Sequence, residues 1–325
     1  MKNWLGASLL IILLSLVTAV VQAVAPRGQP PASQEQQSEQ TNKSVVGVIS
    51  GGVNGTYIRI AADLATVLDG EDLRILPLIG KGSVQNISDL LYLKGVDMAI
   101  VQSDVLEYLK RKGTYGAIDK RIYYITKLYN EEFHLLAAPD IKQLSDLAGR
   151  KVNFDVEGSG TSITASILFD TLKIPVEPTH YDQAAALEKL KSGEIAALAY
   201  VAGKPAQLFQ KLTAADKLHF LPIEYTPALL ETYLPTRLSN PDYPNLIQPD
   251  QDVKTIAVGA VLAVYNWKSN NPRYKKVAHF VNRFFERFND FQQAARHPKW
   301  REVNLSAVLP GWTRFGAAQE WLQRQ

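Results

Sequence analysis

The sequence predicts an α/β protein with two similar lobes, and two observations carry that prediction. From residue 45 onward, short apolar runs alternate with amphipathic stretches of helical period, which is the pattern of an α/β fold. The order strand, glycine turn and Thr-led helix then occurs twice, in VVGVISGGVNGTYIRIAADL and in KVNFDVEGSGTSITASILF. Each copy is followed by a helix, a glycine and a further buried strand. We therefore expect each copy to build one lobe.

The elements of the first lobe follow from the apolar period and from the residues that interrupt it. Apolar runs bounded by Gly, Asp or Ser predict strands at 45–49, 73–79 and 97–103. Apolar residues three and four positions apart predict helices at 57–68 and 83–96 and from residue 106. Gly95 is expected to end the second of these helices.

In the second half of the chain, the same criteria predict strands at 150–156, 196–202 and 253–266. They predict helices at 161–174, 182–195 and 272–295. The last helix carries an apolar stripe of helical period, formed by Val277, Phe280, Val281, Phe284, Phe285 and Phe288. A stripe of this kind predicts core packing rather than a cofactor site.

Composition argues against several kinds of site. The 325 residues include 35 Lys and Arg, 32 Asp and Glu and 5 His, with no block of like charge, so nucleic-acid binding is not expected. Cysteine is absent and the histidines lie far apart in the chain, so neither a disulfide framework nor a metal site is expected. The glycine turns match neither the P-loop nor the dinucleotide fingerprint, and no cofactor is expected.

The first residues have the composition of an export signal. Residues 1–23, MKNWLGASLLIILLSLVTAVVQA, show a lysine, an apolar stretch and small residues before an expected cleavage after Ala23. The competing interpretation is an uncleaved membrane anchor, because the apolar stretch is nearly long enough to span a bilayer. Either way, the rest of the protein is expected to leave the cytoplasm. Residues 24–44 are rich in Pro, Gln and Ser and predict a disordered linker.

Three glycine turns follow predicted strands, namely GGVNGT at 51–56, GKGS at 80–83 and GSGT at 158–161. A turn from a strand into a helix leaves the first helical N–H groups without partners, and the helix dipole makes that end positive. In α/β sheets, ligands bind at these strand ends. The turns therefore predict a site for an anionic group.

Several motifs in a fixed order resemble the TAXI-type solute-binding receptors of TRAP transporters. The family's glycine-rich turn before Gly-Thr-Tyr is similar to SGGVNGTY, its Gly-Ser-Val-x-Asn segment to GKGSVQN, and its Asp-x-Ala-Ile-Val-Gln-Ser-Asp strand to VDMAIVQSD. In the second half, LSDLAGRKVNFDVEGSGTSITA and LKSGEIAALAYVAGKPAQ also resemble family segments. The resemblance extends from about Val45 to at least Phe288.

The resemblance implies a type II periplasmic-binding-protein fold, in which two α/β lobes joined by a hinge close on a ligand in the cleft between them. We accordingly expect lobe 1 at 45–137, lobe 2 at 138–252, and a return to lobe 1 with C-terminal helices at 253–325. The resemblance also implies a periplasmic receptor that catalyses no reaction. It would capture a small anionic solute, such as a dicarboxylate or an acidic amino acid, and deliver it to a TRAP-type membrane permease.

Ten residues at the turns and strand ends are expected to bind the ligand: Thr56, Tyr57, Ser83, Gln102, Ser103, Ser159, Gly160, Thr161, Tyr200 and Gly203. The hydroxyl and free N–H groups at Thr56 would meet a ligand oxygen, and residues 159–161 would clamp an anionic group as the lobes close. The alternatives are structural, with Thr56 and Ser83 as helix N-caps and Tyr57 in the core. Asp104 is expected to cap the helix that follows it.

Two other functions stay open at this point. One is a membrane-tethered sensor that keeps its leader and reports a ligand bound by the same lobes. The other is an enzyme on the same scaffold, although the sequence has no Gly-x-Ser-x-Gly elbow. Carboxylates with a shifted pKa near the cleft, such as Asp155 or Glu157, would favour the enzyme.

Overall fold

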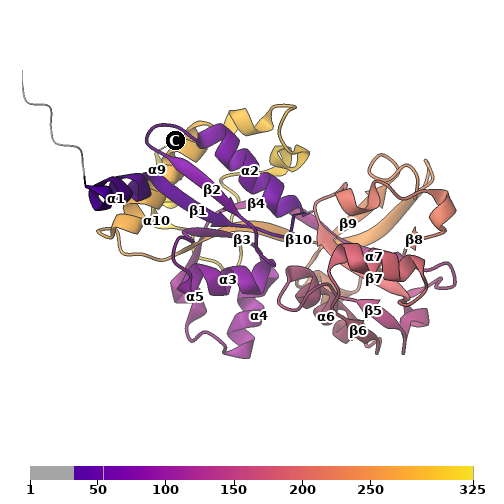
Figure 1. The fold of residues 1–325 in the computed structure, drawn as a ribbon. Helices are drawn as coiled ribbons and strands as arrows, with labels where there is room; N and C mark the ends of the chain where they lie inside the picture. The colour runs from indigo at the N-terminus through magenta and orange to yellow at the C-terminus, as the bar shows by residue number, and fades with distance from the viewer. Residues whose placement is uncertain (1–32, 54, 325) are drawn as a thin grey trace, which may run out of the picture. The chain divides into compact units, whose positions relative to one another are not determined.

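The computed structural model describes residues 33–53 and 55–324 (Figure 1). The predicted signal peptide at 1–23 and the first part of the predicted linker lie outside these residues. The last part of that linker forms helix α1 (Gln34–Ser44), where we expected disorder, because its Gln, Glu and Lys residues have good helix propensity. Within the described residues, every helix is too short or too polar to cross a bilayer. Residues 41–325 form one compact unit, which contains both lobes.

One mixed sheet runs through this unit in the order β2-β1-β3-β10-β4-β7-β5-β6, with β9 paired to β10 and β8 paired to β4. Its strands are β1 (Val45–Ile49), β2 (Arg74–Leu78), β3 (Met98–Gln102), β4 (Ile122–Ala137), β5 (Lys151–Asn153), β6 (Glu177–Thr179), β7 (Ala197–Ala202), β8 (His219–Phe220), β9 (Leu234–Ser239) and β10 (Asp252–Tyr265). Strands β1, β2 and β3 pair in parallel, as do β5, β6 and β7, whereas β4 and β10 are antiparallel to their neighbours.

Helices cover this sheet. The α-helices are α2 (Thr56–Leu68), α3 (Ser83–Tyr92), α4 (Asp104–Lys112), α5 (Ile118–Arg121), α6 (Gly160–Leu172), α7 (Gln183–Lys191), α8 (Pro227–Leu230), α9 (Pro272–Glu286) and α10 (Gly316–Gln323). Short 3-10 turns are η1 (Leu144–Leu147), η2 (Gln207–Phe209), η3 (Ala214–Asp216), η4 (Phe288–Gln292) and η5 (Pro298–Glu302). The predicted order of strands and helices is confirmed in both lobes, although α3 ends at Tyr92, before Gly95.

In lobe 1 the sheet has a core on each face. Met98 and Ile100 of β3 pack in the cluster that contains α2 and α9, whereas Ala99 and Val101 pack in the cluster that contains α3, α4 and α5. Figure 1 shows these two groups of helices on opposite sides of the strands. Because both faces are covered, β3 is a continuous apolar run.

Helix α9 and the C-terminal residues pack on lobe 1. The predicted apolar stripe is buried at Val277, Phe280, Val281, Phe284 and Phe285, which confirms that it belongs to the core. The helix ends at Glu286, well before the predicted residue 295, and Phe288 begins η4. Trp300 of η5 is fully buried and donates its indole N–H to Asp63 at 2.9 Å.

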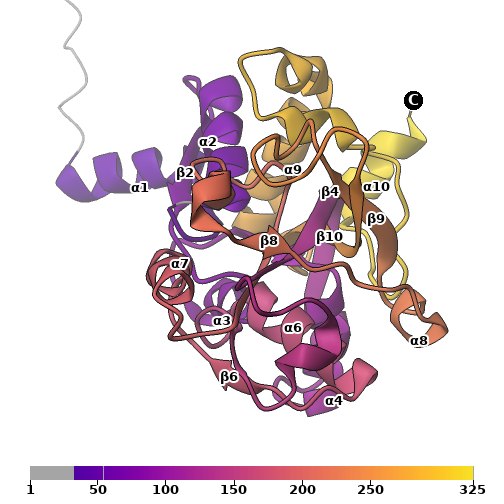
Figure 2. The same cartoon turned by 90° about the vertical axis from the view of Figure 1, so that its right-hand side faces the viewer.

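Two long antiparallel strands, β4 and β10, connect the lobes (Figures 1 and 2). Strand β4, which the sequence did not predict, packs in the lobe 1 core up to Tyr129 and in the lobe 2 core from Phe133. Strand β10 passes from the lobe 2 core back into the lobe 1 core between Val258 and Ala260. The lobes thus meet inside both strands and not at the predicted boundaries, residues 137 and 252, because each strand continues without a break from one core into the other.

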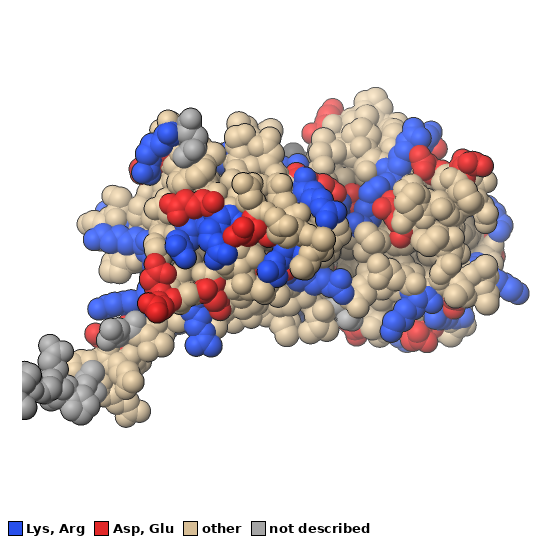
Figure 3. Space-filling model, turned by 90° about the horizontal axis from the view of Figure 1, so that it is seen from above, with Lys and Arg blue, Asp and Glu red and all other residues tan. Residues whose placement is uncertain are grey.

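The charged surface is mixed. Lys and Arg side chains are interspersed with Asp and Glu side chains over the face drawn in Figure 3. Several form exposed ion pairs, such as Lys254 with Glu224 at 3.1 Å, which contribute little to stability. Charges of both signs are thus interleaved on this face, as they are along the sequence.

Candidate functional site

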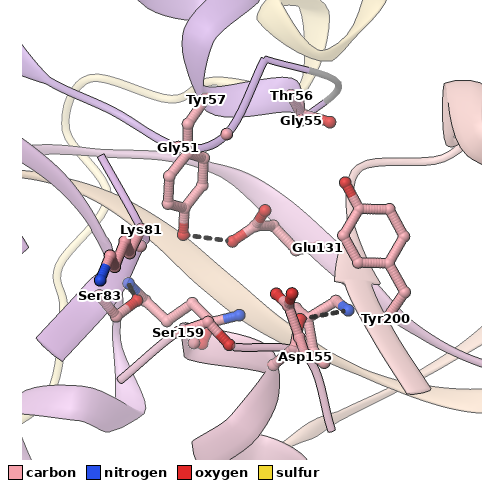
Figure 4. A pocket seen from close by; sticks show the side chains of 16 residues that line it. Gly51, Gly55, Thr56, Tyr57, Lys81, Ser83, Glu131, Asp155, Ser159 and Tyr200 are labelled. Carbon is pink, nitrogen blue, oxygen red and sulfur yellow. Dashed lines mark hydrogen bonds between the residues drawn. The ribbon is translucent and has the colours of Figure 1, made fainter. Parts of the chain in front are cut away.

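A cavity of about 430 Å³, counting its opening to solvent, lies between the two lobes. All three predicted glycine turns reach it, through residues 51, 52, 55, 56 and 81–83 from lobe 1 and residues 159–161 from lobe 2 (Figure 4). Glu131 of β4 also lines it, at the point where the strand crosses between the lobes. We call this cavity the cleft.

Most of the residues predicted to bind a ligand line this cleft. They are Thr56, Tyr57, Ser83, Gln102, Ser159, Gly160, Thr161 and Tyr200. They come from both lobes and from elements far apart in the chain, since Thr56 begins α2 and Tyr200 lies in β7. Their place is as predicted, and their binding role stays a prediction.

Ser103 and Gly203 do not line the cleft, contrary to the prediction. Successive residues of a strand point to opposite sides, and Ser103 directly follows Gln102. The Ser103 Oγ accepts a hydrogen bond from the Gly259 N–H at 3.2 Å, away from the cleft. Gly203 packs against the C-terminal segment, where a Cβ would lie 3.1 Å from Lys299 Cε.

The alternative capping roles of Thr56 and Ser83 are not observed. Gly55 occupies the N-cap of α2 and Gly82 that of α3, and neither helix has a side-chain cap. Ser83 Oγ instead accepts a hydrogen bond from the Gln102 N–H at 2.8 Å. The hydroxyl groups of Thr56 and Ser83 thus lie in the cleft wall and do not cap their helices.

Hydrogen bonds join the lobes beside the cleft. Asp104 Oδ2 of lobe 1 accepts from Thr164 Oγ1 at 2.9 Å and from Tyr233 OH at 3.2 Å, and burial raises the pKa of this carboxyl to about 6. Contrary to the prediction, Asp104 does not cap α4, since the preceding residue has the N-cap position. The Val84 N–H of α3 donates to the Gly158 carbonyl at 3.2 Å. The lobes are therefore in direct contact.

Free donors lie on the cleft wall at the starts of two helices. Among the described residues, nothing accepts from the N–H groups of Thr56 and Tyr57 in α2, or from those of Gly160 and Thr161 in α6. The one side-chain cap at α6 is Ser159, whose Oγ accepts from the Ser162 N–H at 3.1 Å. Both ends are the positive ends of helix dipoles.

Gly160 allows the lobes to approach closely. A Cβ at this position would lie 2.0 Å from Gln102 Oε1 of the other lobe. Gln102 is only 2% exposed, and its Oε1 has no hydrogen-bond partner among the described residues. An unpartnered buried acceptor in the wall of a cavity is costly unless a ligand or water satisfies it.

Two carboxylates in the cleft were not predicted as ligand-binding residues. Glu131 is 2% exposed and accepts a hydrogen bond from Tyr57 OH at 2.6 Å, and burial raises its pKa to about 8. Burial also raises the pKa of Asp155, in the turn after β5, to about 6. The available signal for Glu131 was its pairing with Glu132 in the middle of a 16-residue strand that is mostly buried.

The donor set of the described residues does not suggest a metal centre. No group of three or more His, Asp or Glu side chains among them could hold a metal ion. The cleft therefore presents hydroxyl groups, backbone N–H groups and two carboxylates, which suit a polar organic ligand.

The sequence model of the NMT1-like family matches residues 48–311, a range that includes both lobes and the hinge. A solved protein from Bordetella bronchiseptica RB50 is 14% identical, with a TM-score of 0.54, and the alignment covers 87% of this chain and 98% of the other. The periplasmic binding protein BugD is 12% identical, with a TM-score of 0.50 and coverage of 86% and 93%. These similarities show the type II periplasmic-binding-protein fold, while the TAXI-type assignment stays a prediction.

Proposed function

The chain belongs to the NMT1-like family, and from that premise we propose that it is a receptor whose two lobes close on a small anionic solute. The observation that carries the proposal is the cleft, into which α2 and α6 present N–H groups that have no acceptor among the described residues. A carboxylate suits such donors, since two helix dipoles place positive ends beside it.

The receptor is proposed to work outside the cytoplasm and to deliver its solute to a TRAP-type permease. The signal-peptide layout of residues 1–23 supports export, and the TAXI-type motifs support a TRAP permease as the recipient. BugD, which shares the fold, is a periplasmic binding protein. Loss of uptake of the identified solute on deletion of this protein would test the delivery step.

An enzyme is not proposed, although the carboxylates that would favour it are present. The raised pKa values of Glu131 and Asp155 follow from burial of the two carboxyl groups in the cleft wall. A raised pKa that burial alone accounts for is not evidence of catalysis. Both carboxylates are therefore assigned to ligand binding.

A thermal-shift panel tests the receptor. The full-length protein is unfolded and refolded to remove carried-over ligand, then melted with dicarboxylates, 2-oxoacids, amino acids and the corresponding neutral amides. A solute at about 100 times its Kd should add about 2.7 kcal/mol, a rise of several degrees for a protein of this size. A carboxylate should raise the melting temperature where its amide does not. No rise with any carboxylate would contradict the proposal.

The membrane-tethered sensor uses the same cleft and differs in its leader. N-terminal sequencing of the protein from membrane and soluble fractions distinguishes the two functions. A mature chain that starts after Ala23 supports the exported receptor, and a chain found in the membrane with its leader intact supports the sensor.

A further inference from the structure

A second cavity lies across strand β3 from the cleft. Successive residues of a strand point to opposite sides, and Gln102 lines the cleft whereas Ser103 lines this second cavity. Its volume is about 1390 Å³, counting its opening to solvent, against about 430 Å³ for the cleft. We call it the hinge groove, and its lining consists of residues 103, 104, 106, 107, 127, 230–234, 257–259 and 308–312.

Both lobes contribute to the hinge groove. Tyr233 packs in the core of lobe 2, and Leu309, from the C-terminal segment, packs in the core of lobe 1. The Tyr233 OH donates to Asp104 Oδ2 of lobe 1 at 3.2 Å. The Trp312 indole N–H donates to the Ser103 carbonyl at 3.2 Å. Because hydrogen bonds and core packing hold both walls, the shape of the groove belongs to the fold.

Apolar side chains gather in this groove. Among the described residues, eight large apolar side chains are exposed, and three of them, Leu230, Leu234 and Val308, line the hinge groove. Val308 is 81% exposed. Apolar side chains gathered in one concavity mark ligand-binding grooves, whereas those scattered singly over a surface need no explanation. The hinge groove therefore suits the apolar part of a ligand.

One ammonium group in the groove lacks an anion. Lys127 is half-buried and is the only Lys or Arg in the described lining, and no carboxylate of the described residues lies within ion-pair distance of it. Its side chain lies against β10 at Gly259, where a Cβ would lie 3.1 Å from Lys127 Cε. Burial lowers the pKa of this ammonium group, and Glu302 acts in the opposite direction. Burying a cation in this way is costly unless an anion reaches it.

The acidic side chains of the lining do not supply that anion. Glu107 forms an exposed ion pair with Lys110 at 3.0 Å, and Glu231 is exposed to solvent. Asp104 accepts two hydrogen bonds from hydroxyl groups of lobe 2. Lys127 is thus available to an anionic group that enters the groove.

We propose that the hinge groove is a second ligand site and that its ligand is an amphipathic acid, with an apolar chain or ring and a single anionic group. The apolar part lies against Leu230, Leu234 and Val308, and the anionic group lies beside Lys127. A single anionic group matches the single cation of the described lining. This site is separate from the cleft, so the inference goes beyond the proposed receptor function and does not depend on it.

Isothermal titration with decanoate tests the site, and decanol serves as the neutral probe of the same chain length. The cleft is itself proposed to bind carboxylates, so the full-length wild type is compared with Gly160→Val, in which a side chain enters the cleft. Decanoate should bind both proteins with equal affinity. It should bind roughly tenfold more tightly than decanol, because a charge-assisted hydrogen bond to Lys127 is available to the acid alone.

Two variants connect this binding to the groove. Lys127→Met should weaken decanoate roughly tenfold and leave decanol unchanged, whereas Lys120→Met removes an exposed lysine outside the groove and should change neither affinity. Leu230→Asp places a charge on the apolar wall and should weaken both probes. Leu93→Asp, at an exposed leucine outside the groove, should weaken neither. Melting temperatures near that of the wild type show that each variant is folded.

Each of the other outcomes contradicts the inference. Loss of decanoate binding in Gly160→Val would place the probe in the cleft. Equal affinities for decanoate and decanol, or an unchanged affinity for decanoate in Lys127→Met, would mean that no anionic group is recognised. No binding of decanoate to the wild type, or unchanged binding by Leu230→Asp, would mean that the groove is not a site for such a ligand. The receptor function is tested separately, by the thermal-shift panel.

Discussion

Replacing Glu131 by Gln should make the stability of this protein less dependent on pH. Burial raises the pKa of this carboxyl from 4.5 to about 8, with the hydrogen bond from Tyr57 acting in the opposite direction. The folded protein therefore keeps a proton near neutral pH that the unfolded chain has released. The stability contributed by that proton is complete below about pH 4.5 and is lost as the pH rises through about 8.

The size of the effect follows from the pKa values. A rise from 4.5 to about 8 corresponds to roughly 5 kcal/mol between the acidic and alkaline limits. This is an upper limit, because water that enters the cleft would solvate the ionised carboxylate. Nearby Glu132 raises the same pKa and Lys299 lowers it, so these two groups oppose each other. A few kcal/mol is a large part of a typical stability of about 5–15 kcal/mol.

Urea unfolding at about pH 5, 7 and 9 measures the effect. The free energy of unfolding of the wild-type protein should fall toward high pH. In the Glu131→Gln variant this fall should be smaller, by at least roughly 2 kcal/mol over the same range. Glu71→Gln, which removes an exposed carboxylate, should follow the wild type. If the free energies of unfolding of Glu131→Gln and the wild type fall in parallel, the Glu131 carboxyl does not titrate in this range, which contradicts the prediction.

Two further predictions concern the cleft and its support. Gly160→Val places a side chain where a Cβ would already lie 2.0 Å from Gln102 Oε1, so solute-induced thermal shifts should vanish while the empty protein melts near the wild-type temperature. Gly116→Val, at an exposed turn with open space for a Cβ, should keep the shift; an unchanged shift in both variants would place the solute elsewhere. Lys299→Met leaves Glu132 buried without the cation now 2.9 Å away, and urea unfolding should show a loss of about 3–5 kcal/mol. Adding Glu132→Gln to that variant should restore part of the loss, and no restoration would mean that the pair is not coupled.

Local features of the sequence were sufficient to place much of the candidate site. The turn before Thr56 and the turn before Thr161 each combine a strand, glycines and a helical period, and these signals act over only a few residues. Each turn lies at the C-terminal end of a strand, and such ends gather along one edge of a sheet. The cleft wall formed by α2 and α6 could therefore be predicted without knowledge of the tertiary structure.

The choice between neighbouring residues needed more than a local pattern. Gln102 and Ser103 are both polar residues at the end of a buried strand, and the sequence offers no reason to prefer one. The side of β3 on which each lies depends on the pairing with β10, where Ser103 bonds to Gly259. That contact joins residues 156 positions apart.

The sequence by itself determined the strands and helices on either side of the glycine turns, the turns themselves and the apolar faces, because these depend on residues a few positions apart. Only the tertiary structure decided that Glu131 lies in the cleft, since its position follows from β4 crossing between two cores and pairing with β10 at Val258. It likewise decided that Asp155 of one lobe is in the same cavity as Glu131. The charge balance of the cleft depends on contacts between segments that are distant in the chain.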